Sequence, residues 1–271
     1  FNKYYSSDLM SLVVITNDGI DKTKNIIDEV FSKIKIKEIN KNDLIMDRKI
    51  LKTPSTIKYI PIENENRLTL IWEVPFFKNH PTQFPLEFLG ELIGNEKKNS
   101  IHDIFTNKNY IYDVSCYVRE IIFTNCLFCI EFKLTPLGEN NKKEIIFTIM
   151  KYIEKIENNI DSKLFEELYN DRLKLLKYKF DHFEKSGCID TIIELNTFLN
   201  IYNIDPKKVF IIDSIQEKYS KNVKDNLRKI LEKLTLNNLV IIIGSKKYEK
   251  YKYQKNIKIF PNYGTKYISI N

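Results

Sequence analysis

Histidine is scarce in this sequence, and the shortage limits the metal chemistry that the chain can support. The 271 residues contain only His80, His102 and His182. A histidine-based catalytic metal site usually takes two histidines one helical turn apart, so that both ring nitrogens reach the metal. None of the three has another histidine within a helical turn. We therefore expect no such site, and we expect His80 and His182 in solvent and His102 at a surface or capping position.

Long apolar runs are also absent. No stretch reaches the roughly 18 uninterrupted apolar residues that a membrane span needs, so we expect no membrane contact. The opening residues, Phe1-Asn2-Lys3, contain no starting methionine and no signal peptide, which indicates a fragment of a longer chain. Because 43% of the residues are hydrophobic, the chain can build a packed core as one large domain or two small ones.

Cysteine is limited to Cys116, Cys126, Cys129 and Cys188. Cys126 and Cys129 lie three residues apart within an alternating strand pattern, so their side chains should point to opposite faces and cannot bind one metal together. A thiol or metal enzyme built on Cys126, Cys129 or His102 is therefore disfavoured. Buried free thiols are the expected state, which is typical of a reducing compartment and favours a cytoplasmic location.

The net charge of +7 does not by itself indicate a nucleic-acid partner. Lysine is interspersed with aspartate and glutamate along the whole chain, and no recognised basic motif accompanies the positive charge. We therefore predict no nucleic-acid binding.

The first part of the chain predicts a strand, a helix and a charged linker. Ser6–Thr16 is apolar and β-branched, as a strand requires, and Ile20–Ile34 has apolar residues at helical spacing. Lys35–Pro54 is charged and aperiodic, which is typical of a linker. From Thr56 a second unit begins with the strands "TIKYIPI" and "RLTLIWEV".

The rest of this unit predicts two short helices, a strand pair and then mainly helices. Ser100 is a candidate N-cap with Asp103 completing a capping box, and Asp161 is a candidate cap where a long helical region breaks. The expected helices are 84–94, 100–105, 142–183 with a break near 161–162, and 192–205, and the expected strands are 110–120, 124–134 and, as the final strand, 238–245.

Strand pairs followed by a run of helices predict an α+β fold, in which a two-layer, mostly antiparallel twisted sheet carries helices on one face. "SSDLMSLVVI" near the start and "LNNLVIIIGS" near the end share a polar pair, a leucine and a strand core. Either the same kind of strand closes two successive units, or two buried strands are alike by chance. The first interpretation gives the boundaries 1–36, a linker at 37–55 and a second domain at 56–271.

Five segments, in order along the chain, resemble the insulinase and pitrilysin family of zinc metallopeptidases. They are "FNKYYSSDLMSLVVI", "YIPIENENRLTLIWEVP", "FLGELIGNEKKNSI", "FKLTPLG" and "NYGTKY". The resemblance implies the LuxS/insulinase-like metallohydrolase fold. It also implies four homologous domains in two halves around a chamber, with zinc in the first domain only. Residues 1–36 would then be the terminal strand and helix of a catalytic-type domain, and residues 56–271 the second, non-catalytic domain.

The resemblance further implies that the parent protein is a zinc metalloendopeptidase that degrades peptides. The family's H-x-x-E-H zinc motif is absent here, so zinc is expected only in the parent's first domain, and this fragment is expected to be inactive alone. The alternative is a structural or scaffolding pseudopeptidase of the same family that lacks zinc chemistry. The implied partners are peptide substrates and the remaining domains of the parent, and exposed former interfaces could also drive a homodimer.

In the family the second domain forms part of the chamber wall and carries an exosite for the amino terminus of the substrate, which binds by strand addition. The matching positions are Gly94, Val114 and Cys116, and Asn95 and Glu96 stand where the family has a polar pair. Glycine is common at the position of Cys116, so this sequence departs from the pattern there. The ordinary alternative is that Gly94 only ends a helix and the other two residues are plain strand positions.

"NYGTKY" near the end places Tyr263 and Tyr267 on either side of a Gly-Thr turn. These tyrosines either pack a linker back onto the domain, which we favour, or face the chamber.

Overall fold

The computed structural model describes residues 4–39, 49–76, 84–120, 125–184, 187–200, 204–214, 216–251 and 257–270. The chain divides into two compact units. Unit 1 contains residues 1–47, 77–82 and 173–216, and unit 2 contains residues 48–76, 83–172 and 217–271. His80 and the middle of the predicted linker, residues 40–48, lie outside the described residues.

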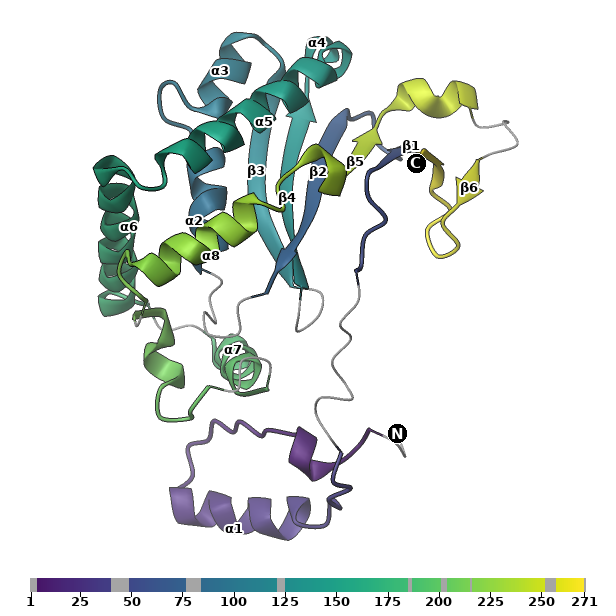
Figure 1. Cartoon of the computed structure of the whole chain (residues 1–271). Helices are drawn as coiled ribbons and strands as arrows, with labels where there is room; N and C mark the ends of the chain where they lie inside the picture. The colour runs from purple at the N-terminus through teal and green to yellow at the C-terminus, as the bar shows by residue number, and fades with distance from the viewer. Residues whose placement is uncertain are drawn as a thin grey trace. The chain divides into compact units, whose positions relative to one another are not determined.

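Unit 2 is built on a seven-stranded mixed sheet with the order β3-β4-β2-β5-β1-β7-β6 (Figure 1). Only β1 and β5 run parallel, and every other neighbouring pair is antiparallel. The strands are β1 (Ser55–Tyr59), β2 (Arg67–Pro75), β3 (Ile111–Glu120), β4 (Asn125–Leu134), β5 (Leu239–Gly244), β6 (Lys258–Ile259) and β7 (Lys266–Ile270). The predicted α+β fold and the predicted neighbours β3 and β4 are confirmed.

Helices of unit 2 cover one face of this sheet, where Figure 1 shows α2, α5 and α8. α8 packs against α2 and α5 as well as against β2. The helices of this unit are α2 (Phe84–Ile93), α3 (Ile101–Asn107), α4 (Pro136–Asn140), α5 (Lys142–Asn159), α8 (Lys221–Leu231) and the first part of α6 (Lys163–Asp181). None of the helices in the described part of the chain combines the length and apolar content of a membrane span.

The core of unit 2 is built on one face of β2 and β4. Every second side chain of each strand points toward the helices, and these side chains are at most 1% exposed over most of both strands. Trp72 lies opposite Phe128 in the sheet, and its indole N–H donates to the Thr235 carbonyl over 3.0 Å. Burying each large side chain of this row stabilises the fold by about 1.5–3 kcal/mol. The row consists of Leu68, Leu70, Trp72, Val74, Cys126, Phe128, Ile130 and Phe132.

One of the two predicted helix caps is confirmed. The Ser100 hydroxyl accepts a hydrogen bond from the Asp103 backbone N–H, which is the N-cap half of a capping box, while the Asp103 carboxylate accepts the N–H of Asn99 rather than that of Ser100. The other prediction is wrong, because Ser162 rather than Asp161 accepts the N–H of Phe165 at the start of α6. Asp161 instead pairs with Lys224 and Arg228 of α8, and these two cations compete with the helix end for its carboxylate.

Two strand predictions are corrected by the structure. Ser6–Thr16 is not a strand but contains a short 3-10 helix, Ser7–Leu9, followed by an unpaired segment. An apolar, β-branched sequence becomes a strand only where a neighbouring strand satisfies its backbone, and the described part of unit 1 offers none. Residues 238–245 do form β5, but β6 and β7 follow it, so β5 is not the final strand.

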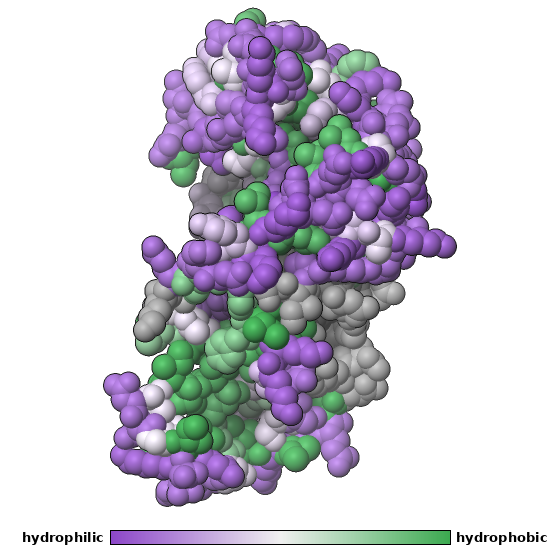
Figure 2. Space-filling model, turned by 90° about the vertical axis from the view of Figure 1, so that its left-hand side faces the viewer, coloured by the Kyte–Doolittle hydropathy of each residue, from purple (hydrophilic) through white to green (hydrophobic). Residues whose placement is uncertain are grey.

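Unit 1 is otherwise helical and exposes much of its apolar surface. Its elements are α1 (Ile20–Phe31), α7 (Cys188–Asn200), the 3-10 helix Val209–Ser214 and the end of α6. None of the residues of α1 is buried, although its apolar residues recur at helical spacing as predicted. In the extended segment, Leu12 is 47% exposed and Val14 45%. Figure 2 shows hydrophobic side chains gathered on the surface of this unit.

Gly138 is predicted to be indispensable for the fold of unit 2. A Cβ atom at this position would lie 1.8 Å from the Tyr110 carbonyl oxygen, so Gly138→Ala forces the backbone apart. We expect a loss of at least about 3 kcal/mol in the free energy of unfolding, measured by urea titration. Gly90→Ala is the matched control, because its Cβ would meet its nearest atom at 3.5 Å, an ordinary contact. Equal stability of the two variants would contradict the assignment.

Candidate functional site

Strand β3 leaves one backbone edge open, because it is the outermost strand and its neighbour is β4. The Val114 N–H donates to its neighbour's carboxylate, Asp113 Oδ1, over 2.8 Å rather than to β4. This N–H therefore points to the open side. Because the pairing is regular from Asp113 to Glu120, the backbone groups of Cys116 and Val118 also point to the open side.

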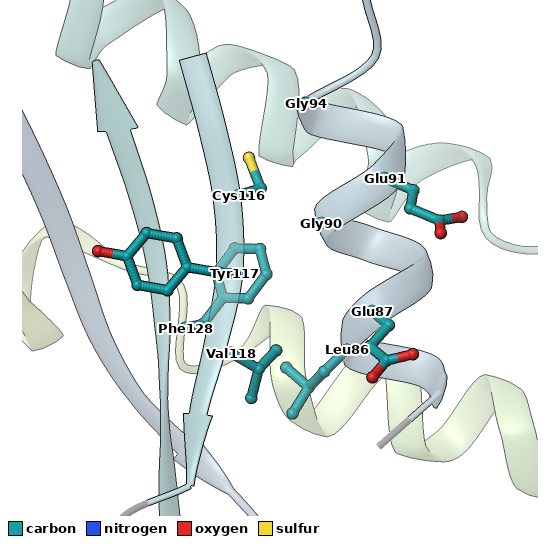
Figure 3. A pocket seen from close by; sticks show the side chains of 9 residues that line it. All are labelled: Leu86, Glu87, Gly90, Glu91, Gly94, Cys116, Tyr117, Val118 and Phe128. Carbon is teal, nitrogen blue, oxygen red and sulfur yellow. The ribbon is translucent and has the colours of Figure 1, made fainter. Parts of the chain in front are cut away.

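A cavity of about 300 Å³ lies between β3 and α2. Figure 3 shows the Phe128 ring between Cys116 and Val118, on the side of β3 that faces α2. The Tyr117 ring points to the opposite side, where its hydroxyl donates to Glu131. The cavity is lined by Leu86, Glu87, Gly90, Glu91, Gly94, Cys116, Tyr117, Val118 and Phe128.

Two glycines one turn apart let α2 approach β3 closely. A Cβ at Gly90 would lie 3.5 Å from Cys116 Cβ, and a Cβ at Gly94 would lie 3.4 Å from Cys116 Sγ and 3.1 Å from the Gly90 carbonyl oxygen. Gly94 does not have positive φ, so no left-handed helix cap requires a glycine there. A Cβ at Gly94 would be tight only against the Gly90 carbonyl oxygen, and its distance to Cys116 Sγ would be an ordinary contact.

Glu87 and Glu91 of α2 line the cavity, but their carboxylates do not point into it. Figure 3 shows the carboxylates of Glu87 and Glu91 on the side of α2 turned away from Cys116. Glu91 forms an ion pair with Arg172 of α6. Glu96 is exposed in the turn that follows α2, and the Asn95 side chain accepts the N–H of Lys97 over 2.7 Å, which orders this turn.

Cys116, which lines the cavity, and Cys129, on the opposite face of the sheet, are poor nucleophiles. Burial raises the pKa of Cys116 to about 12, and burial likewise raises the pKa of Cys129 to about 11. Cys129 lies on the face of the sheet opposite to Cys126, as the spacing predicted, so the two thiols do not share a site. All four cysteines are free, but Cys188 is exposed, which corrects the expectation that every thiol is buried.

The structure brings together some of the residues predicted from the sequence. Gly94 and Cys116 are in direct contact, and Val114 lies one strand repeat from Cys116 on the same face, 6% exposed. The sequence analysis missed Gly90 and Phe128. The i, i+4 spacing of Gly90 and Gly94 is a signal for close packing of a helix, but the partner of that face is visible only in the structure.

The histidines do not form a metal site in the described part of the chain. His102 is half-buried on α3, and His182 is exposed at the end of α6 with Nδ1 2.9 Å from the Tyr178 carbonyl oxygen. Among the described residues, no three His, Cys, Asp or Glu side chains lie close enough to hold a metal ion. The residues that the structure describes therefore do not fit a catalytic zinc.

The tyrosines of "NYGTKY" lie in different environments. Tyr263 is 77% exposed and stacks on Phe260 in the turn between β6 and β7. Tyr267 is half-buried on β7, opposite Tyr59 of β1. Tyr263 therefore does not pack into the body of the unit, whereas Tyr267 belongs to the sheet.

Comparisons with known proteins give one consistent result. A family model described as "Peptidase M16 inactive domain" matches residues 1–170. "Insulin-degrading enzyme-like 1, peroxisomal" of Arabidopsis thaliana is 24% identical over 258 residues, which are 92% of this chain and 25% of that protein. Nardilysin of Homo sapiens is 24% identical over 208 residues, which are 74% of this chain and 18% of that protein.

The solved structures agree on the fold. The crystal structure of pitrilysin superposes with a TM-score of 0.81 at 17% identity, over 99% of this chain and 27% of that chain. A protease from Helicobacter pylori gives a TM-score of 0.54 at 17% identity, over 84% of this chain and 53% of that chain. This chain thus spans about a quarter of pitrilysin and of the Arabidopsis relative.

We predict a fixed order of thiol reactivity. At pH 8 a thiol with a pKa of about 12 is ionised in roughly one molecule in ten thousand. Exposed Cys188 should therefore react with N-ethylmaleimide first, and Cys116 and Cys129 should react slowly and faster as the pH rises. Peptide mass spectrometry after timed labelling measures this order. Labelling of Cys116 as fast as Cys188 would contradict it.

Proposed function

The chain belongs to the M16 peptidases, the insulinase and pitrilysin family of metallopeptidases, as an inactive domain, and we propose that it holds the amino-terminal end of peptide substrates. The observation that carries this proposal is the open edge of β3 beside the cavity under α2. In the proposed mode an extended peptide pairs with β3, so that main-chain hydrogen bonds supply most of the affinity. Gly94, Val114 and Cys116 are its contact residues.

The edge of β3 has what strand addition needs. Val114, Cys116 and Val118 present backbone groups to the open side, and the N–H of Val114 is held only by the adjacent Asp113 carboxylate. A peptide carbonyl can replace that carboxylate, because the Val114 N–H then loses its hydrogen bond to Asp113 and gains one to the peptide. Each new main-chain hydrogen bond contributes about 0.5–1.5 kcal/mol.

The charge around the cavity supports recognition of a free amino terminus. The carboxylates of Glu87 and Glu91 lie on the side of α2 turned away from Cys116, whereas Glu96 is exposed in the turn after Gly94. Carboxylates favour a nearby ammonium group, and in exposed positions each such pair contributes about 0.2–1 kcal/mol. Because Glu91 already pairs with Arg172, exposed Glu96 is the carboxylate that this preference depends on.

The chain acts, in this proposal, with the remaining domains of a parent zinc metalloendopeptidase. Residues 56–271 form its second domain and a part of the chamber wall, 37–55 are the linker, and 1–36 are the terminal strand and helix of the catalytic-type domain. The last assignment is supported by α1, none of whose residues is buried, and by the unpaired apolar segment before it. A cytoplasmic location and a homodimer stay predictions, and the Arabidopsis relative is named as peroxisomal.

A structural pseudopeptidase of the same family is the second candidate. The lack of any fit to zinc among the described residues is expected for this domain under both candidates. Sequencing the native transcript upstream of the Phe1 codon separates the two candidates. An H-x-x-E-H motif with a downstream glutamate is expected for the peptidase, within about one domain length of roughly 200 residues. A first domain without those residues would make the parent a pseudopeptidase.

Binding of a short fluorescent peptide with a free amino terminus tests the substrate-holding role. Acetylating that terminus removes its positive charge and should weaken binding about two- to fivefold, as measured by fluorescence anisotropy. Val114→Pro removes a donor on the open edge and should weaken binding about fivefold or more.

Val114→Ala is the matched control for Val114→Pro. It loses part of the same side chain but keeps the N–H, so it should retain binding while Val114→Pro loses it. The Val114 N–H makes no hydrogen bond to β4, so the proline leaves the β3–β4 ladder intact. Indifference of the peptide affinity to both acetylation and Val114→Pro would refute strand addition at β3.

A further inference from the structure

We propose that Arg119 is a specificity-determining residue of the proposed peptide site and selects an acidic side chain a few residues after the peptide's amino terminus. This inference rests on the proposed strand addition and adds to it a requirement on the peptide's sequence. Main-chain hydrogen bonds supply affinity but no preference among side chains. Arg119 supplies a charge preference at a single peptide position.

Arg119 lies near the end of the edge strand, on the face of the sheet opposite to α2. The pairing of β3 is regular from Asp113 to Glu120, so Arg119 shares a face with Tyr117, which Figure 3 shows pointing away from α2. The Arg119 side chain is exposed there. A peptide strand paired with β3 points every second side chain to this same face. One of these side chains therefore comes to lie beside Arg119.

The guanidinium group of Arg119 is held in position by its neighbour on the strand. It lies 5.2 Å from the centroid of the Tyr117 ring, which attracts it by a cation–π interaction. The Tyr117 hydroxyl in turn donates to Glu131 over 3.3 Å. A cation that is already positioned loses less conformational freedom when a ligand binds, so more of the ion-pair energy appears as affinity.

The charge of Arg119 is not neutralised by its described surroundings. No described carboxylate forms an ion pair with Arg119, and the Glu131 carboxylate is engaged by Arg67 over 2.7 Å. An acidic side chain of the peptide can therefore pair with Arg119 without displacing an existing partner. Opposite charges that face each other across two strands attract, and like charges in the same position repel.

The direction of α2 indicates which way the peptide runs along the edge. Figure 3 shows Leu86, in the first turn of α2, beside Val118, whereas Gly94, directly after the helix, contacts Cys116. α2 therefore runs opposite to β3, and the turn with Glu96 lies toward the start of β3. A peptide whose ammonium group lies near Glu96 runs along the edge toward the end of β3, as a parallel strand.

A positional scan of the fluorescent peptide on the full chain tests the inference. The peptide has a free amino terminus and a polar, uncharged sequence, and one of its first positions at a time carries glutamate, glutamine or lysine. Both strands rise by roughly 3.3 Å per residue, so the residue beside Arg119 is roughly the third to fifth. There glutamate should bind about threefold or more tightly than lysine, since attraction and repulsion add. The two flanking positions point to the opposite face and should show a smaller preference.

Variants of Arg119 should change the ratio of glutamate to lysine affinity in a fixed order. Arg119→Lys should keep the preference for glutamate, Arg119→Gln should abolish it and Arg119→Glu should reverse it. Because Arg119 is exposed, these changes leave the core untouched. Lys133→Gln is the matched control, since it removes an exposed cation from the same face of β4, opposite Asp113 at the other end of the strand pair. It should leave the ratio unchanged.

The outcomes separate this inference from the function on which it rests. If acetylation and Val114→Pro weaken binding but every position accepts lysine as well as glutamate, Arg119 does not determine specificity and strand addition still holds. If a preference for glutamate persists in Arg119→Gln, or is lost equally in Lys133→Gln, the assignment to Arg119 is overturned. If no peptide binds at all, both proposals fail.

Discussion

The dry contact between the helices and one face of the β2–β4 pair is the constraint on which unit 2 depends. Eight alternating side chains of these two strands are almost completely buried, and the Trp72 indole is tied to the Thr235 carbonyl. The opposite face is mixed, with half-buried Arg67 and Glu131 paired over 2.7 Å. A sheet with one fully buried face has a strongly fixed register, because a slip by one residue would expose the whole row. Through the pairing of β3 with β4, the same register fixes which side chains of β3 face the helices.

An open edge strand usually promotes aggregation. In this chain, residues of β3 itself oppose aggregation through that edge. Asp113 accepts the N–H of Val114, so a carboxylate both occupies the first free donor and places a charge at the edge. A second copy of the sheet would have to bring its own backbone past that charge. A peptide with a positive amino terminus gains from the nearby acidic groups instead. The same feature therefore discriminates against edge-to-edge pairing of sheets and in favour of the proposed ligand.

The sequence predicted several elements of unit 2, though not α8, β6 or β7, because burial on one face causes a periodic pattern. Alternation identified β2, β3 and β4, and helical spacing identified α2 and α5. Prediction failed where the outcome depends on a partner. Ser6–Thr16 has the composition of a strand, but no described strand of unit 1 lies beside it. Asp161 is of a residue type that often caps helices, but its carboxylate forms ion pairs with Lys224 and Arg228 instead. The site shows the same division, since Gly94 and Cys116 were predicted while Phe128, which reaches the cavity from β4, was not.

The two units differ in how much of their apolar surface each buries by itself. This difference indicates which unit carries the proposed site. Unit 2 buries a continuous core and carries the cavity, so its site needs no other part of the chain to exist. Unit 1 exposes apolar side chains on both its extended segment and α1, with Ile26 51% and Val30 54% exposed. Apolar residues at helical spacing evolve under burial, because an isolated amphipathic helix gains little in water. The exposed apolar side chains of unit 1 therefore indicate a surface that another protein segment covers. In unit 2, by contrast, the exposed feature is the open backbone edge of β3.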